Sequence, residues 1–242
     1  MKNRLFVFGD SWCFNYFTKK PNEFYPGTKP FFGLSHVESY VNYYDNFGHW
    51  LDYMETFFEV VSYGLGGVSN EQIIWQLSNL PEYVEGDRII IIFTGAERYM
   101  WTHGDRRYTF ASGSRLPEMV LEKKYLNLFR QQYVEKYEYW MSDMDYHFEK
   151  KFINIFPSFF KKYEPICVTW RGEVAEKIES IELLDFDNYN FSSITEESGG
   201  TYIDGHLGAL GNFDLFKYFA KKLQLEIDES HYNVKKFKKN LF

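Results

Sequence analysis

Four short apolar runs, separated by longer amphipathic stretches, set the hydrophobic pattern of this 242-residue chain. Each run is too short for a helix and is rich in β-branched or aromatic residues, as buried strands are. The stretches between them have a helical pattern, and this alternation predicts an α/β fold with a mostly parallel sheet. The predicted strands are residues 5–8, 60–63, 89–93 and 166–169.

Three of the intervening stretches predict particular helices. Residues 48–58 precede the second strand, and residues 207–223 close the fold. After the second strand, Ser69 and Gln72 have the spacing of a capping box, which marks the start of a helix. We expect that helix to run to about residue 83 and to stop near Gly86.

Longer segments interrupt the alternation. Residues 99–117 have little periodicity and predict an irregular insertion above the sheet, and residues 185–201 are also expected to be irregular. Residues 118–156 contain neither Gly nor Pro and carry an apolar residue every three or four positions. This pattern predicts one long helix or two stacked ones, with a stripe that suits the core or a subunit contact. We expect one domain over residues 1–224 and a tail over 225–242.

Composition narrows the class of protein. Aromatic residues make up 21% of the chain, so either some of them line a binding surface or codon bias supplies Phe and Tyr in place of Leu. The net charge of −7 argues against a nucleic-acid partner, which needs a basic surface to displace counterions. Two cysteines are too few for a disulfide scaffold, and both are expected to be buried thiols. We expect neither a signal peptide nor a transmembrane helix.

A Gly-Asp-Ser tripeptide that ends at Ser11 directly follows the first predicted strand. A serine at this turn has its hydroxyl at the carboxyl end of the sheet, where open α/β sheets bind ligands. Near the other end of the chain, Asp204 and His206 are separated by one glycine. They supply a general base and a carboxylate that can orient it, so the order of the three residues is that of a catalytic triad.

Gly-Asp-Ser after the first strand, glycine turns after the second and third strands, and a late Asp/His element together resemble the SGNH, or GDSL-type, hydrolase family. The resemblance covers about residues 4–224. It implies a three-layer, flavodoxin-like α/β/α sandwich and an esterase that removes small acyl groups from carbohydrates or lipids, without a metal or cofactor. The Gly-x-Ser-x-Gly elbow and chain order of α/β-hydrolases are a different pattern.

Carried over by position, the resemblance makes Ser11 the nucleophile and, through its backbone N–H, the first oxyanion donor. Gly67 matches the family's second donor, and N–H groups fixed at a turn stabilise an oxyanion without reorganisation. His206 would take the Ser11 proton and Asp204 would orient His206. The common family form has two residues between acid and histidine, so a backbone carbonyl or another acid stays open as the orienting group. The one-residue spacing resembles that of SGNH-like sugar O-acetyltransferases.

The block after the third strand departs from the family. Glu97 stands where the family has an asparagine whose amide donates to the oxyanion. An ionised carboxylate only accepts hydrogen bonds, and losing one donor costs on the order of 10²–10³ in rate. A carboxylate about 4 Å from the oxyanion would add roughly 4 kcal/mol of repulsion at an effective dielectric near 20. Three arrangements avoid this: Glu97 turns away, Asn70 reaches in from the second loop, or, as we favour, Arg98 donates instead.

Substrate contacts are expected from the same edge of the sheet. Trp12 adjoins Ser11, Glu97 and Arg98 follow the third strand, and Arg171 follows the fourth, where a surface ion pair explains it equally well. The histidines have no metal-ligand spacing beyond a pair that suits a helix-face hydrogen bond, so we expect no metal site.

These observations predict a serine esterase acting on a small-molecule or glycan ester, with O-acetyl removal from a neutral glycan favoured. Two alternatives stay open. Glu97 favours an impaired, carbohydrate-binding or virion structural protein, and the Asp-x-His spacing favours a sugar O-acyltransferase. The expected location is cytoplasmic, or virion-associated because the chain also resembles family members encoded by bacteriophages. The oligomeric state does not follow from the sequence.

Overall fold

The computed structural model describes residues 2–13, 48–64, 68–80, 82–95, 98–103, 106–111, 156, 158, 161–176, 178–197, 199 and 205–231. For 98–103 and 106–111 it describes the backbone alone. The predicted long helical segment over 118–156, apart from Phe156, and the end of the predicted tail lie outside these residues.

Five parallel strands form the main sheet, in the order β2-β1-β3-β6-β7. β1 (Arg4–Phe8) lies between β2 (Glu59–Ser62) and β3 (Arg88–Phe93). β6 (Ile166–Thr169) and β7 (Glu182–Leu183) continue the sheet beyond β3. Numbered along the parallel sheet this is 2-1-3-4-5, the strand order of flavodoxin-like folds. The four predicted strands are confirmed to within about one residue at each end, and the fifth is too short to give a periodic signal.

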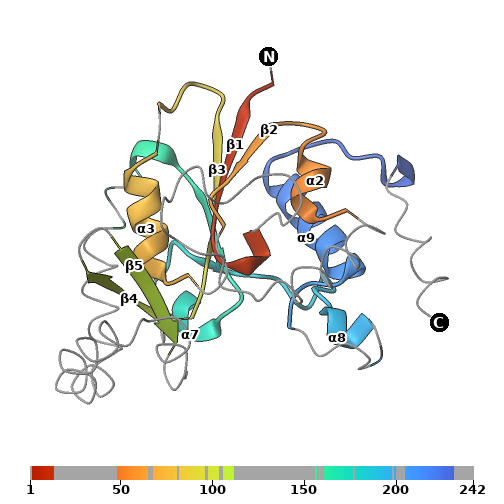
Figure 1. The fold of residues 1–242 in the computed structure, drawn as a ribbon. Helices are drawn as coiled ribbons and strands as arrows, with labels where there is room; N and C mark the ends of the chain where they lie inside the picture. Colours follow the sequence, from red (N-terminus) through yellow and green to blue (C-terminus); the bar gives the residue numbers. More distant parts are fainter. Residues whose placement is uncertain are drawn as a thin grey trace.

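Alternation of side chains along the strands divides the core into two layers. The odd-numbered side chains of β1 pack with α2 (Trp50–Met54) and α9 (Ala209–Lys222). The even-numbered ones pack with α3 (Asn70–Ser78) and α7 (Gly172–Ala175). Helices therefore cover both faces of the sheet, and the fold is a three-layer α/β/α sandwich (Figure 1).

The three predicted helices begin within two residues of the expected positions, and two of them end early. The Ser69 hydroxyl accepts a hydrogen bond from the Gln72 N–H at 3.3 Å and caps α3. α3 ends at Ser78 instead of near residue 83, because Leu80 precedes a proline and residues in that position avoid the helical region. α2 is also shorter than predicted, while α9 matches the predicted closing helix.

Residues 98–103 and 106–111 are strands, where the sequence predicts an irregular insertion over residues 99–117. β4 (Arg98–His103) and β5 (Arg106–Ala111) form an antiparallel two-stranded sheet. The signal lay in residue types, since aromatic and β-branched residues flank a Gly-Asp pair that is typical of hairpin turns. α8 (Ile194–Glu197) is likewise a short helix inside a stretch predicted to be irregular.

The composition also led to expectations about the two cysteines and about membrane-spanning helices. Both cysteines, Cys13 and Cys167, are buried free thiols, as predicted. None of the helices in the described part of the chain combines the length and the apolar character that a membrane span requires.

A buried carboxylate ties together the amino ends of β1 and β3. Asp87 accepts hydrogen bonds from the Arg4 side chain at 3.2 and 2.6 Å and from the Val84 N–H at 3.0 Å. Burial opposes ionisation of Asp87, but the Arg4 guanidinium and the N–H donors outweigh burial, so the pKa of Asp87 is lowered. The ionised carboxylate therefore stabilises the end of the sheet opposite to the edge where ligands bind.

Asp87→Asn is expected to lower the free energy of unfolding by about 2 kcal/mol at neutral pH, because Arg4 loses its anion. Denaturant titrations of both proteins measure this difference. Since the folded-state pKa is depressed, the wild-type advantage is complete above the unfolded pKa of about 3.9 and is lost as pH falls through the folded value. An advantage that persists unchanged in strong acid would contradict the assignment.

Candidate active site

Ser11 begins the 3₁₀ helix η1 (Ser11–Cys13), which follows β1 at the carboxyl end of the sheet (Figure 1). In this strand order the chain crosses from one side of β1 to the other, and the gap beside β1 is where ligands bind. Asp10 shapes the turn, because its carboxylate accepts from the Trp12 N–H and its carbonyl from the Cys13 N–H, both at 3.0 Å. Ser11 thus lies at the ligand-binding edge of the fold.

Two glycines let neighbouring segments approach η1. A Cβ on Gly9 would lie 2.9 Å from the Ile92 carbonyl oxygen, and a Cβ on Gly64 would overlap the backbone of Cys13. Ser62 donates its hydroxyl to the Cys13 carbonyl and accepts from the Gly64 N–H at 3.2 Å. The turn that carries Ser11 is therefore locked to the loop after β2.

Cys13 is the other nucleophile in this turn, and its surroundings keep it unreactive. Its Sγ atom lies 3.5 Å from the Phe8 carbonyl oxygen, to which it donates. Burial, with a smaller contribution from Asp10, raises the pKa of Cys13 well above its usual range. A buried, protonated thiol is a poor nucleophile, which leaves Ser11 as the candidate.

His206 lies in the loop before α9, and the segment around α8 holds this loop. The His206 carbonyl accepts from the Ile194 N–H at 2.7 Å, and the Gly208 N–H donates to the Ser192 carbonyl at 2.8 Å. The Nε2 atom of the His206 ring is buried. The two backbone hydrogen bonds fix the chain at His206 and at Gly208, so they limit the movement of the loop that carries the imidazole.

Glu197, which sequence reasoning missed, caps α9 beside this loop. Its carboxylate accepts from the Ser192 hydroxyl at 2.5 Å and from the N–H groups of Leu210 and Gly211 at 2.9 and 3.1 Å. Burial raises the pKa of Glu197 despite these hydrogen bonds. A Cβ on Gly208 would overlap the carboxylate, so the glycine makes room for the cap.

A chain of hydrogen bonds joins the Ser11 turn to the His206 loop. The Trp50 indole N–H donates to the Trp12 carbonyl at 2.6 Å, and the Trp50 backbone N–H donates to the Asn212 side chain at 3.2 Å. The Asn212 amide in turn donates to the carbonyls of Leu207 and Gly208 at 3.0 and 2.9 Å. Asn212 and Trp50 are fully buried, so these bonds hold the neighbours of Ser11 and His206 in one unit.

A second histidine lies near His206. His49 is buried, and its Nδ1 atom accepts from the Leu51 N–H at 3.3 Å, which caps α2. Burial first, and then electrostatic repulsion from His206, lower the pKa of His49 to about 3. His49 is therefore neutral at physiological pH.

Asn70, a candidate oxyanion donor, is paired with the Thr94 backbone. Its amide donates to the Thr94 carbonyl, and its side-chain oxygen accepts from the Thr94 N–H, each at 2.8 Å. This pair ties the first residue of α3 to the loop after β3. One of the two amide hydrogens is thus engaged, and a role for Asn70 at the oxyanion stays a prediction.

The predicted substrate contacts Trp12 and Arg171 belong to one array with Trp170, a residue that sequence reasoning did not select. The Trp12 and Trp170 rings stack with centroids 5.7 Å apart and planes tilted by 22°. The Arg171 guanidinium lies 4.9 Å from the Trp170 ring centroid and pairs with Glu173 at 2.6 Å. Arg171 therefore makes the surface ion pair that was the alternative. Trp170 directly follows β6, a position that could have indicated it.

Gly67, Glu97, Arg98 and Asp204 are the remaining predicted site residues. Gly67, Glu97 and Asp204 lie outside the described residues, and Arg98 is placed only by its backbone as the first residue of β4. In the described part of the chain no hydrogen bond joins the Ser11 hydroxyl to the His206 ring. The same residues contain no group of three His, Cys, Asp or Glu side chains arranged to hold a metal ion.

Comparisons with known proteins do not identify a family. No protein-family model matches the chain, and no curated protein or solved structure is significantly similar to it. The functional interpretation therefore depends on the motifs and on the geometry described above.

Asn212→Ala is expected to lower the free energy of unfolding by about 2–3 kcal/mol, because it leaves buried backbone groups without their partners. Denaturant titration measures the loss. Asn188→Ala is the matched control, since this exposed amide bonds only to neighbouring Asp185 and should cost less than about 0.5 kcal/mol. Equal losses in the two variants would show that Asn212 does not hold the loop.

His49→Asn is expected to flatten the acid side of the stability profile. Asn also caps helices, but wild-type His49 takes up a proton on unfolding between its ordinary pKa of about 6.5 and its folded pKa of about 3. Wild-type stability should therefore fall with falling pH in this window, by at most about 1.4 kcal/mol per pH unit from this residue. Identical pH profiles for the two proteins would refute the buried neutral state.

Proposed function

We propose that the protein is a serine esterase of the SGNH type in which Ser11 attacks an ester carbonyl and His206 accepts its proton. The observation that carries the proposal is the buried link through Trp50 and Asn212, which joins the Ser11 turn to the His206 loop at the ligand-binding edge. Catalytic hydrogen bonds are often long or poorly aligned without substrate and tighten when it binds. The proposed reaction therefore does not require a hydrogen bond between Ser11 and His206 before the substrate binds.

The reaction proceeds in two halves. The Ser11 Oγ atom bonds to the carbonyl carbon, the carbonyl electrons move to oxygen, and the Ser11 proton passes to His206. Collapse of this intermediate releases the alcohol, which takes the proton from His206 and leaves an acyl group on Ser11. Water then attacks the acyl group, with His206 as base again, and releases the carboxylic acid. Asp204 is proposed to orient the imidazole.

The oxyanion is proposed to bind to the N–H groups of Ser11 and Gly67, with Arg98 as a third donor. Asn70 is the weaker candidate, because its amide is already bonded to the Thr94 backbone. Arg98 compensates for the missing family asparagine only if Glu97 points away from the oxyanion, since the carboxylate would repel it.

A neutral acylated glycan is the proposed substrate, and O-acetyl removal the proposed reaction. The Trp12–Trp170 stack supplies aromatic surface beside Ser11, and aromatic faces pack against the C–H faces of sugar rings. The net charge of −7 disfavours anionic polymers. If Glu97 silences the site, the same surface suits a carbohydrate-binding protein, and the Asp-x-His spacing keeps acyl transfer to a sugar hydroxyl as a third candidate.

A fluorophosphonate probe should label the wild-type protein at Ser11, because the probe reacts only with an activated serine. Labelling should disappear in Ser11→Ala and slow by at least about 10³-fold in His206→Ala. Ser230→Ala, which changes an exposed serine in another part of the chain, should label like the wild type. Absence of labelling in all four proteins, or labelling that survives Ser11→Ala, would exclude the esterase.

Release of free acetate, in place of acetate moved to an acceptor sugar, distinguishes hydrolysis from transfer.

A further inference from the structure

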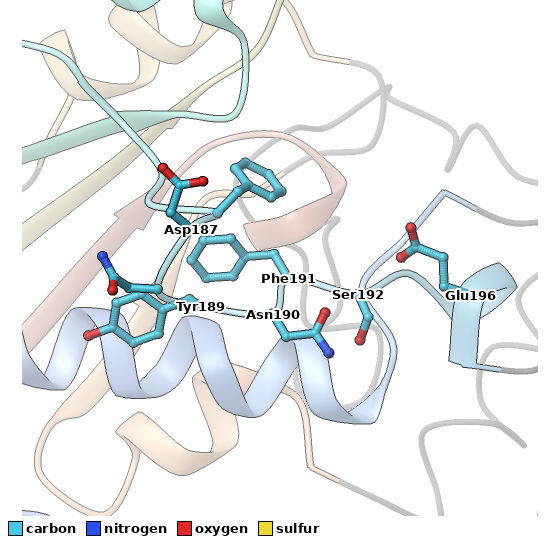
Figure 2. A pocket seen from close by; sticks show the side chains of 8 residues that line it. Asp187, Tyr189, Asn190, Phe191, Ser192 and Glu196 are labelled. Atoms are coloured by element: carbon cyan, nitrogen blue, oxygen red, sulfur yellow. The ribbon is translucent and has the colours of Figure 1, made fainter.

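A pocket of about 380 Å³ lies on the segment between β7 and α8, beside the loop that carries His206. Figure 2 shows its lining side chains along one stretch of chain that passes over α9 and ends at Glu196 in α8. The Asn190 N–H donates to the Asp214 carboxylate of α9 at 3.1 Å, which holds this stretch in place. None of the residues discussed for the reaction lines this pocket.

Three aromatic rings form one wall. Phe186 is 51% exposed, and its ring meets the Phe191 ring at 84° with centroids 5.0 Å apart. Phe191 is buried and stacks on Tyr189 at 5.7 Å and 12°, and Tyr189 packs against Tyr218 of α9. The wall is therefore anchored in the core, and the exposed Phe186 ring is available for a ligand without rearrangement.

Polar side chains complete the pocket. Asp187, Asn190 and Glu196 are exposed and contribute carboxylate and amide groups to the lining. The Asn190 amide and the Ser192 side chain lie between the Phe191 ring and Glu196 (Figure 2). Five of the eight lining residues are polar or charged and three are aromatic, so the pocket offers both hydrogen-bonding groups and ring faces to a ligand.

We propose that this pocket binds a neutral pyranose ring. The C–H face of the sugar would lie on Phe186, because the electron-rich ring face attracts polarised C–H groups. Its hydroxyls would donate to Asp187 and Glu196 and exchange hydrogen bonds with Asn190. The two carboxylates repel anionic sugars, so the ligand is a hexose or an N-acetylhexosamine and not a uronic or sialic acid.

The position of the pocket relates it to the Ser11 site. Ser192 lines the pocket, and its carbonyl accepts the Gly208 N–H in the His206 loop. If the Ser11 site acts on a glycan, the pocket binds another ring of the same chain and raises affinity for polymeric over small substrates. This second statement depends on the proposed esterase, whereas sugar binding by the pocket does not.

Saturation-transfer NMR on the 242-residue Ser11→Ala protein tests the proposal with methyl glycosides of glucose, galactose, mannose and N-acetylglucosamine. We expect transfer to the ring C–H protons of at least one glycoside, and about tenfold weaker binding in a Ser11→Ala/Phe186→Ser double variant, as for loss of an aromatic contact at a binding site. Leu183→Ser in the same background is the matched control, because Leu183 is 49% exposed on β7 but outside the pocket, and it should bind like the parent.

Transfer to none of the glycosides, or equal binding by the Phe186 variant and its control, overturns the proposal. Phe186-dependent binding of choline alone also overturns it, because the rings and carboxylates would then hold a cation. Fluorophosphonate labelling of the wild-type protein separates the two proposals, and the single Phe186→Ser variant should label like the wild type. Labelling of the wild type, with no sugar binding by the Ser11→Ala protein, removes only the pocket. Phe186-dependent sugar binding by the Ser11→Ala protein, with no labelling of the wild type, removes only the esterase.

Discussion

The buried side-chain amide of Asn212 is the contact on which the proposed site depends. It lies within α9, yet it bonds to the backbone at the start of α2 and to two carbonyls in the His206 loop. From α2 the Trp50 indole reaches the turn after β1. A buried polar group without partners costs about 1–3 kcal/mol, so this arrangement is favoured over any in which the loop moves away.

The strand order of the flavodoxin-like sheet places the segments that Asn212 joins near the edge where ligands bind. A 2-1-3-4-5 strand order puts the carboxyl end of β1 at the crossover, where a ligand can approach between loops. Small residues at Gly9 and Gly64 allow the Ser11 turn to pack tightly against β3 and the second loop. On the other side, Glu197 and Ser192 fix the His206 loop. Both halves of the candidate site therefore rest on rigid elements, as precise chemistry requires.

Much of the fold followed from the chain because its signals are local. The apolar runs around Leu5, Val60, Ile89 and Ile166 each form a strand, and Ser69 caps its helix. The strand predictions failed where a strand was too short to show a hydrophobic pattern, or where residue type and not hydrophobic periodicity marked it. β7 has two residues, and the antiparallel pair of β4 and β5 is marked by β-forming residue types on either side of a Gly-Asp pair in the sequence, not by hydrophobic periodicity.

The supporting residues of the site could not be predicted in the same way. These residues act through hydrogen bonds to segments that are distant in sequence, as Trp50, Asn212 and Glu197 do. The residues next to each of them in the sequence do not indicate which segment it will contact. Ser11 and His206 could be selected from the sequence because Gly-Asp-Ser follows the first strand and an Asp-x-His element comes late in the chain. Together they have the residue order of a catalytic triad. The resemblance that they carry stays a hypothesis, since no known family or structure matches the chain.

The distance between the Ser11 Oγ atom and the nearer ring nitrogen of His206, measured in a crystal structure of the protein, tests the account most directly. The account predicts a separation of about 3 Å, or a single water molecule that bridges the two groups. Rings and hydroxyls held about 10 Å or more apart, far beyond the reach of a hydrogen bond, would contradict it.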